Sequence, residues 1–414
     1  MLATVGRKPL LFIMLGAFVL RAATGIALQD HLNHIWKRSF LIEGDAAGYW
    51  ELGRKIAHHQ PYALYEPPRK IYRMPGFPAL LALSIRMSGG SFLWTRILLA
   101  GVGAAACGLV FYLGRELFDK QTGLTAACFT AISPVMTGFS VVILSETLFA
   151  ACLLASLLVL AKLINTKFQP DQRNRAILLS LGAGVTIAAA CYVRPSWLAV
   201  GPIFAVLYPL MADNRKQAAL RSLLVLSGLG LALFPWAYRN QKISGHWIAT
   251  TLWVGPSLYD GLNPRAIGDS DMSFFENDRA LERMTEFEVD RFYRRKAWQF
   301  VAENPGRALQ LALLKLVRFW KPWPNAAQFH GWLNRTAVLV FFIPVMLLAV
   351  RGCWICRRQF WPVCLTLGPV LYFAAIHTLF VASLRYRLPA EYPLCVLSAV
   401  GLQSWLHKQP ETSV

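Results

Sequence analysis

The sequence predicts an all-α, polytopic membrane protein with about ten transmembrane helices, external juxtamembrane helices and a larger external loop region. Its composition is 56% hydrophobic and 15% charged, with a mean hydropathy of +0.42. Apolar runs long enough to cross ~30 Å of hydrocarbon recur along the whole chain of 414 residues. A soluble domain of this length would be less apolar, and a transmembrane β-barrel would show alternating segments of ~10 residues, which these runs do not.

The expected spans follow the apolar runs in order. We place them at about 9–28, 92–114, 121–140, 142–163, 176–193, 196–212, 221–238, 334–350, 361–382 and 390–406. Residues 76–88 are too few to cross and include Arg86, so we expect a juxtamembrane or half-inserted helix there. The first run resembles a signal peptide, but it exceeds an h-region of ~7–15 residues and no small-residue cleavage site ends it. We therefore expect a retained helix.

The short connections set the expected orientation. The alternate ones are basic, with Arg115 and Lys120, then Lys162, Lys167, Arg173 and Arg175, then Arg215, Lys216 and Arg221, then Arg351, Arg357 and Arg358, and finally Lys408 after the last span. By the positive-inside rule these connections and both termini are cytoplasmic. Two large regions, 29–91 and 239–333, are then external, within one expected domain spanning 1–414. The second region should contain amphipathic helices at 278–303 and 306–320, the latter lying on the membrane surface because its apolar residues recur at helical spacing.

The net charge of +20 is explained mainly by the excess of lysine and arginine that is usual in the loops of membrane proteins. It would also give the protein affinity for anionic lipid headgroups or for a phosphate-bearing substrate. The basic residues are scattered over short loops and form no soluble basic domain, so we expect no nucleic-acid partner. The eight cysteines lie mostly in apolar runs, and the single Cys353-Trp354-Ile355-Cys356 pair is a weak metal or redox signal that we read as incidental.

Unusual polar residues gather on the expected outer side. The first external region holds Glu43, Asp45, Tyr49 and Arg73, and later outer turns hold Glu146, Arg194, Asn240, Arg385 and Arg387. Any one of them is accounted for by an interfacial or snorkelling side chain. Placing an ionisable side chain in or next to a membrane span costs free energy, however. The occurrence of all these residues on one side of the membrane therefore favours a common site.

These residue types suit one reaction. A carboxylate removes a proton from an acceptor hydroxyl as it attacks, and arginines bind phosphate oxygens and stabilise the charge on a departing phosphate. Aromatic residues are abundant nearby, and they stack on sugar rings or form an interfacial belt, two interpretations of equal weight. They are Tyr49, Trp50, Tyr62, Tyr65 and Tyr72.

Several short motifs occur in a fixed order. Asp45 is followed by Tyr49, and Arg73 precedes Pro75-Gly76-Phe77-Pro78. Ser133-Pro134, Ser145-Glu146, Pro235-Trp236-Ala237-Tyr238-Arg239-Asn240, Gly261-Leu262-Asn263-Pro264 and Arg385-Tyr386-Arg387-Leu388-Pro389 follow. In this order the chain resembles the GT-C superfamily of integral-membrane glycosyltransferases, and more narrowly the bacterial glycosyltransferase family 39 group that includes protein O-mannosyltransferases, the aminoarabinose transferase and rhizobial core-sugar transferases.

The resemblance implies transfer of a sugar, with inversion, from a polyprenyl-phosphate carrier to a lipid, glycan or protein acceptor at the periplasmic face of the inner membrane. It implies Asp45 as general base, with Arg73 and one or both of Arg385 and Arg387 on the carrier phosphate. Glu146 and Asn240 would shape the pocket, with Glu43, Tyr49 and Arg194 beside them. Many relatives have two adjacent acidic residues where Gly44 here separates Glu43 from Asp45, and we prefer Asp45.

Asp269-Ser270-Asp271 resembles the DxD motif that holds a metal and nucleotide sugar in soluble transferases. No nucleotide-binding α/β pattern accompanies it, so we interpret it as a polar turn. We accordingly expect no nucleotide-sugar donor, no cofactor and no required metal.

Three other classes compete with this interpretation. A transporter or flippase would place polar residues near the bilayer midplane and show repeated halves. A polysaccharide ligase would use a large late loop without a carboxylate in the first one. A non-catalytic scaffold would need none of these residues. Replacing Asp45 with Asn separates the transferase from all three.

Overall fold

The computed structural model describes residues 7–276, 281, 284–323 and 331–406. Within them the chain is built from helices, with a single isolated β-bridge between Leu64 and Arg69. The predicted all-α fold class is confirmed. Lys408 and the predicted start of the 278–303 helix lie outside the described residues.

The first half of the chain alternates long helices with short ones. Its elements are α1 (Arg7–His31), η1 (Leu32–Trp36), α2 (Glu43–Ala57), α3 (Gly76–Ser88), α4 (Phe92–Leu117), α5 (Lys120–Ile132), α6 (Pro134–Ser140), α7 (Glu146–Ile164), η2 (Pro170–Gln172), α8 (Arg173–Val193), η3 (Pro195–Trp197) and α9 (Val200–Met211).

The second half carries the larger region between spans. Its elements are α10 (Arg215–Ser244), α11 (Val254–Gly261), α12 (Ser273–Glu276), α13 (Glu286–Glu303), α14 (Pro305–Trp320), α15 (Trp332–Cys356), α16 (Phe360–Ile376) and α17 (Leu384–Leu406).

Among the described residues, six helices are long and apolar enough to cross a membrane, or seven if the bent pair α5–α6 is one span. α3, η3–α9 and α16 are shorter apolar helices. The chain between α5 and α6 bends by 64°, where the sequence analysis expects one span over 121–140. The bend follows from Ser133-Pro134, because Pro cannot continue the preceding helix and Ser133 caps the next one by accepting a hydrogen bond from the Met136 amide. The total of about ten spans stays a prediction.

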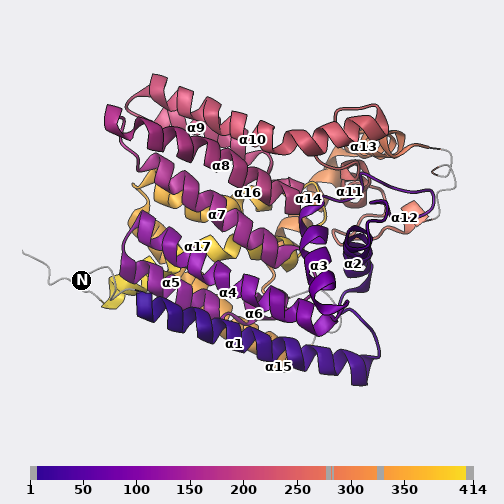
Figure 1. Ribbon diagram of the computed structural model, residues 1–414, viewed down its shortest axis with the longest axis horizontal. Helices are drawn as coiled ribbons and strands as arrows, with labels where there is room; N and C mark the ends of the chain where they lie inside the picture. Colours follow the sequence, from indigo (N-terminus) through magenta and orange to yellow (C-terminus); the bar gives the residue numbers. More distant parts are fainter. Residues whose placement is uncertain (1–6, 277–280, 282–283, 324–330, 407–414) are drawn as a thin grey trace, which may run out of the picture.

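The long helices run side by side, and α17 lies among them (Figure 1). α17 packs against α4, α5, α7, α15 and α16, and nearly every side chain from Arg387 to Ala399 is buried. The approach of α15 is close because both helices present glycine. A Cβ on Gly352 would lie 1.9 Å from the Leu397 carbonyl oxygen, and one on Gly401 would lie 2.1 Å from that of Leu348. The last helix is thereby fixed at the centre of the bundle, with its first turn at one end.

The helices of the two regions predicted to be external lie at that same end of the bundle, and we name these regions the first and second external regions after that prediction (Figure 1). α2 and α3 come from the first region, and α11 to α14 come from the second. α14 buries Leu311, Lys315 and Phe319 while its apolar residues Leu309, Leu313 and Val317 stay largely exposed. This arrangement fits the prediction that the helix lies on the membrane surface, because an amphipathic helix there presents its exposed apolar residues to lipid.

Candidate active site

Two arginines hold Asp45 at the end of the bundle where the external regions meet. Asp45 lies in the first turn of α2. Its Oδ1 lies 2.7 Å from Nη2 of Arg73, and its Oδ2 lies 2.7 Å from Nη1 of Arg385. The two cations come from distant parts of the sequence, one before α3 and one from the first turn of α17. Both carboxylate oxygens are therefore ion-paired in the absence of a ligand.

Glu146 extends this network inward. Its side chain is only 1% exposed, and its Oε1 accepts hydrogen bonds from Arg194 Nη2 at 2.6 Å and from Nε of Arg385. Arg194 also donates to the Ser145 hydroxyl at 2.9 Å. Oε2 of Glu146 is buried and has no hydrogen-bond partner among the described residues. Glu146 thus lies behind the arginines and orients them.

Counting these five groups gives three guanidiniums against two carboxylates, a net charge of one positive unit. The side chains of Arg73, Arg194 and Arg385 are each 14–15% exposed. Arg73 also lies over the Tyr49 ring at 4.1 Å, which fixes its plane. A partly desolvated cluster with one uncompensated cation is suited to bind a single anion.

The same arginines set the protonation state of the carboxylate. Burial would raise the pKa of Asp45, but the neighbouring charges of Arg385 and Arg73 outweigh burial and hold this pKa well below its ordinary value. Asp45 is therefore ionised in the ligand-free protein at every physiological pH. As long as both arginines hold it, it is a poor proton acceptor.

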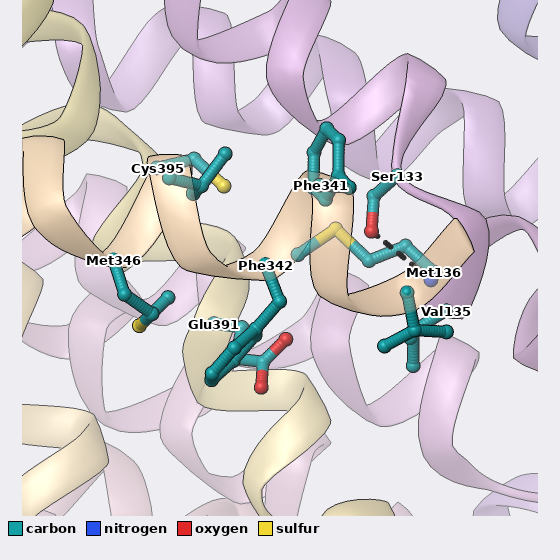
Figure 2. A pocket seen from close by; sticks show the side chains of 10 residues that line it. Ser133, Val135, Met136, Phe341, Phe342, Met346, Glu391 and Cys395 are labelled. Atoms are coloured by element: carbon teal, nitrogen blue, oxygen red, sulfur yellow. Dashed lines mark hydrogen bonds between the residues drawn. The ribbon is translucent and has the colours of Figure 1, made fainter. Parts of the chain in front are cut away.

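The network opens on a cavity of about 580 Å³, a volume typical of small-ligand sites. Its polar wall includes Asp45, Arg73, Arg194 and Arg385, and aromatic and aliphatic groups from α7, α16 and the second external region complete it. Figure 2 shows a second cavity, lined by Phe341, Phe342 and Met346 of α15, by Glu391 and Cys395 of α17, and by residues at the start of α6. That cavity measures about 10 Å³, room for at most one water molecule, so the larger cavity is the candidate active site.

The segment that carries Arg73 is held from several sides. Glu286 of α13 accepts a hydrogen bond from the Ile71 amide at 3.2 Å, and the Leu252 amide donates to the Ile71 carbonyl at 2.9 Å. Behind the segment, a Cβ on Gly76 would lie 2.6 Å from the Tyr192 carbonyl oxygen, so only glycine permits α3 to pack on the end of α8. The second external region therefore clamps the first and fixes Arg73 over the cavity.

The structure brings together most of the residues that the sequence singles out. Asp45, Tyr49, Arg73, Arg194 and Arg385 line the cavity, and Glu146 lies directly behind them.

Besides Glu146, three predicted residues lie outside the cavity lining. Glu43 is exposed at the start of α2. Asn240 is fully buried, and its side chain donates to the Ile248 and Thr250 carbonyls at 2.9 and 3.3 Å, so it fixes the start of the second external region. Arg387 points the opposite way from Arg385, because residues two apart on an α-helix lie about 200° apart around its axis. Its guanidinium is buried against the Phe319 carbonyl and against Glu391, and Glu391 lines the small cavity of Figure 2.

The structure also places residues in the cavity wall that the sequence analysis does not select, including His377, Tyr386 and Asp260. Tyr386 lies between Arg385 and Arg387 within the Arg385-Tyr386-Arg387-Leu388-Pro389 motif. His377 is a single histidine in an apolar run, and Asp260 directly precedes the Gly261-Leu262-Asn263-Pro264 motif. The sequence signal for Tyr386 is its membership of a motif, and the signal for Asp260 is its position next to one. His377 has neither signal.

The Asp269-Ser270-Asp271 segment folds onto α11 and α14. The Ser270 hydroxyl and the Asp271 amide donate to Asp260 at 2.7 and 2.8 Å, and Asp269 pairs with Arg318 at 3.1 Å. Within the described part of the chain, no group of three or more His, Cys, Asp or Glu side chains is arranged to hold a metal ion. The expectation that no metal is required stays a prediction.

Comparison with known proteins gives one family match and several fold matches. Residues 68–238 match the family model described as dolichyl-phosphate-mannose-protein mannosyltransferase, over less than half of the chain. This segment includes Arg73, Glu146 and Arg194. No curated protein sequence matches the chain significantly.

Among solved structures, the oligosaccharyltransferase AglB from Archaeoglobus fulgidus, in complex with an inhibitory peptide and a dolichol-phosphate, aligns over 95% of this chain with a TM-score of 0.56 and 16% identity. The apo form of the Archaeoglobus fulgidus oligosaccharyltransferase aligns over 97% with a TM-score of 0.57 and 16% identity. The alignments cover 50% and 53% of those chains, so this chain spans about half of their length. ArnT from Cupriavidus metallidurans bound to undecaprenyl phosphate gives a TM-score of 0.46 at 12% identity, over 95% of this chain and 77% of that one.

These alignments cover nearly the whole bundle, and the family match covers the part of the sequence that supplies three residues of the ion-pair network. The predicted helical membrane fold is thereby confirmed, because the chain shares the fold of the Archaeoglobus fulgidus oligosaccharyltransferase over nearly its whole length.

Proposed function

We propose that this protein is a membrane glycosyltransferase that moves a sugar from a polyprenyl-phosphate carrier to an acceptor hydroxyl, with inversion and with Asp45 as the general base. The observation that carries the proposal is the pairing of one carboxylate with two arginines in the wall of a cavity. A base beside an anion site is what transfer from a phosphate leaving group needs. The name of the matching family and the dolichol-phosphate bound to AglB agree with a lipid-phosphate donor.

The charge of the network favours a monophosphate carrier. A polyprenyl-phosphate sugar is a phosphodiester with one negative charge, which balances the single net positive charge of Arg73, Arg194 and Arg385 against Asp45 and Glu146. A pyrophosphate-linked donor would bring at least two negative charges and leave the site negative overall. Cleavage of the monophosphate donor adds a second charge to the leaving phosphate, and guanidiniums stabilise that developing charge.

In the proposed reaction, the acceptor oxygen attacks C1 of the sugar while Asp45 takes its proton. The bond between C1 and the phosphate oxygen breaks, and its electron pair leaves with polyprenyl phosphate. The acceptor approaches from the face opposite the phosphate, so the configuration at C1 inverts. Arg73 and Arg385 hold the phosphate on the departing side.

In the ligand-free geometry Asp45 cannot act as a base until its two arginines release it. Arg73 and Arg385 are the groups that bind the phosphate, and they are also the groups that lower the pKa of Asp45. We therefore propose that the donor phosphate takes these guanidiniums over from Asp45. The carboxylate then loses its partners while it stays in a confined cavity, and its proton affinity rises. Donor binding thus prepares the base before the acceptor reacts.

The site faces the periplasm in this proposal. Support comes from the basic short connections, which the positive-inside rule places in the cytoplasm, and from the position of both large regions at the end of the bundle that carries the cavity. Reporter fusions test the orientation. A fluorescent protein fused after Arg358 should fold and alkaline phosphatase fused after Gly245 should be active, and the reverse pattern would contradict it.

The activity is tested with radiolabelled polyprenyl-phosphate sugars on membranes that contain the wild type, Asp45→Asn or Glu51→Gln. Glu51 lies two turns from Asp45 on the same helix and pairs with Arg54 outside the cavity, so it is a matched control. We expect label to reach an acceptor with the wild type and the control, and not with Asp45→Asn. Equal transfer by all three proteins would remove Asp45 from the mechanism, and transport of the intact donor without transfer would favour a flippase.

A further inference from the structure

His377 occupies a fixed position in the cavity wall, and the mechanism above does not use it. It follows the last residue of α16, and its Nδ1 lies 2.7 Å from the Val381 carbonyl oxygen. A carbonyl oxygen only accepts hydrogen bonds, so Nδ1 carries the hydrogen in this contact. In a neutral imidazole the other nitrogen, Nε2, then presents a lone pair.

The ring cannot easily turn away from this position. It stacks on Tyr386 with a centroid separation of 4.4 Å and an interplanar angle of 16°, and Phe319 lies 6.2 Å away on an almost parallel plane. His377 is 8% exposed, and it is one of the residues that line the cavity. No hydrogen bond to Nε2 is formed by the part of the chain that the structure describes.

The surroundings favour a neutral imidazole. The ring is buried, and two cations, Arg194 and Lys315, lie near it and disfavour a further positive charge. Arg194 lies 5.7 Å from the Tyr386 ring, so the histidine is one aromatic ring away from the network that holds the phosphate in the proposed function. A neutral acceptor in this place offers a lone pair and adds no charge.

The other strong acceptors of the cavity wall are already engaged. Both oxygens of Asp45 bind arginines, and both oxygens of Asp260 receive hydrogen bonds from the 270–271 turn. A sugar in the cavity brings several hydroxyl donors that lose water on binding, and each buried donor without an acceptor costs about 1–3 kcal/mol. In the proposed function the donor phosphate releases Asp45, and that carboxylate then takes the acceptor proton. The Nε2 lone pair of His377 offers a further acceptor for one of the other sugar hydroxyls.

We propose that His377 is a specificity-determining residue whose Nε2 accepts a hydrogen bond from a hydroxyl of the donor sugar or of the acceptor. This inference rests on the proposed function. It assigns a polar contact to the part of the wall formed by the end of α16 and the ring of Tyr386. A site that hydrogen-bonds one hydroxyl rejects substrates that lack it, because the acceptor is then left unpaired.

Two substitutions separate this contact from the structural bond to Val381. The amide nitrogen of His377→Asn mimics Nδ1 and keeps the bond to Val381, but the side chain has no atom at the place of Nε2. His377→Gln reaches the place of Nε2 with a carbonyl oxygen, but it gives up the Nδ1 position. A binding role predicts that Asn fails and Gln is tolerated, and a purely structural role predicts the opposite.

The experiment measures binding to the full-length protein in nanodiscs. The probes are polyprenyl phosphate without a sugar and polyprenyl-phosphate mannose, and the ratio of their affinities gives the contribution of the sugar. Transfer kinetics with the same donor give the KM of the acceptor. We expect all variants to bind polyprenyl phosphate like the wild type, because the arginines are unchanged.

If the contact is with the donor, His377→Asn should lose about 5- to 20-fold of the sugar-dependent affinity, and His377→Gln should keep most of it. If it is with the acceptor, donor binding should stay constant and His377→Asn should raise the acceptor KM by a similar factor. An unchanged sugar ratio and an unchanged acceptor KM in His377→Asn would overturn the inference. Failure of the wild type to bind polyprenyl phosphate would instead contradict the proposed function.

Discussion

Nη1 of Arg385 lies 2.7 Å from Oδ2 of Asp45, so the carboxylate proposed to act as a base is ion-paired with a cation proposed to bind the substrate. Arg73 makes the equivalent contact with the other oxygen. The pairing explains how two positive side chains and a carboxylate share a poorly solvated cavity. It also connects substrate binding with the reactivity of the base, and the predictions below follow from it.

The first prediction compares Arg385 with Arg387, which the sequence motif treats alike. Arg385→Gln should weaken binding of polyprenyl phosphate about 10- to 100-fold, because a charge-assisted hydrogen bond to the phosphate is lost. Arg387→Gln should leave this affinity close to that of the wild type and lower the melting temperature, because it leaves Glu391 buried without its partner. Titration of both variants in nanodiscs with polyprenyl phosphate checks the pair, and equal losses of affinity would contradict the assignment.

The second prediction concerns the pH dependence of transfer. In the ligand-free protein Arg385 and Arg73 hold the pKa of Asp45 well below its ordinary value. Asp45 therefore stays ionised, and keeps its ion pairs, even at a pH where an ordinary aspartate would be protonated. The kcat/KM for the donor, which reports the free protein, should therefore show no acid limb from Asp45 between about pH 5 and 8.

The kcat reports the donor-loaded protein, in which the phosphate holds the arginines. Its acid limb should lie at a higher pH than any limb in kcat/KM, because Asp45 has lost the cations that lowered its pKa. Parallel profiles measured with a labelled donor at saturating and limiting concentrations check this difference. Identical profiles would show that the arginines stay on Asp45 throughout the reaction.

The third prediction concerns Glu146, the buried partner of Arg194 and Arg385. Glu146→Gln removes the counter-charge of two desolvated guanidiniums, and it should destabilise the protein by about 3 kcal/mol and reduce transfer. Replacing Arg194 with Gln in the same protein should restore part of the melting temperature, since one uncompensated cation is gone. Thermal unfolding in detergent measures this coupling, and strictly additive losses would show that the two side chains act independently.

The fourth prediction concerns Lys315, which α14 buries completely against the turn that carries His377. Its Nζ donates to the Thr378 and Leu379 carbonyls at 3.0 and 2.8 Å. Burial lowers the pKa of Lys315 from 10.5 to about 8. The folded protein thus releases this proton at a lower pH than the unfolded chain does, and stability should rise as pH increases from 8 to 10.5. Lys315→Met should flatten this rise in the melting temperature, whereas an unchanged slope would place its cause elsewhere.

Much of the fold is predictable, because the length of an apolar run and the periodicity of its apolar residues determine where a helix forms. The helix expected at 76–88 has those bounds in the structure, and the one expected at 306–320 begins one residue earlier. The break at Ser133-Pro134 is also encoded locally, yet the apolar run through it conceals the bend. Runs of similar hydropathy do not show whether a proline bends a span or ends it.

The site is predictable in its composition but not in its geometry. The motifs supply Asp45, Arg73 and Arg385, and the fold brings them within ion-pairing distance. Arg385 lines the cavity and Arg387 is buried in the bundle. This difference depends on where α17 begins and on which of its faces the neighbouring helices cover. Asn240 belongs to a motif too, but its side chain supports a loop. The sequence does not predict His377 as a site residue. A single histidine in an apolar run carries no signal by itself, and its place in the cavity wall depends on the turn that follows α16.

The central claim is that Asp45 takes the acceptor proton in a protein that already holds the donor. The most direct measurement is a single-turnover experiment, in which purified protein is loaded with labelled polyprenyl-phosphate sugar and then mixed with acceptor. Asp45→Asn should bind the donor at least as well as the wild type, because its arginines are released, and transfer about 10²- to 10⁴-fold more slowly. Transfer by donor-loaded Asp45→Asn at the wild-type rate would contradict the account.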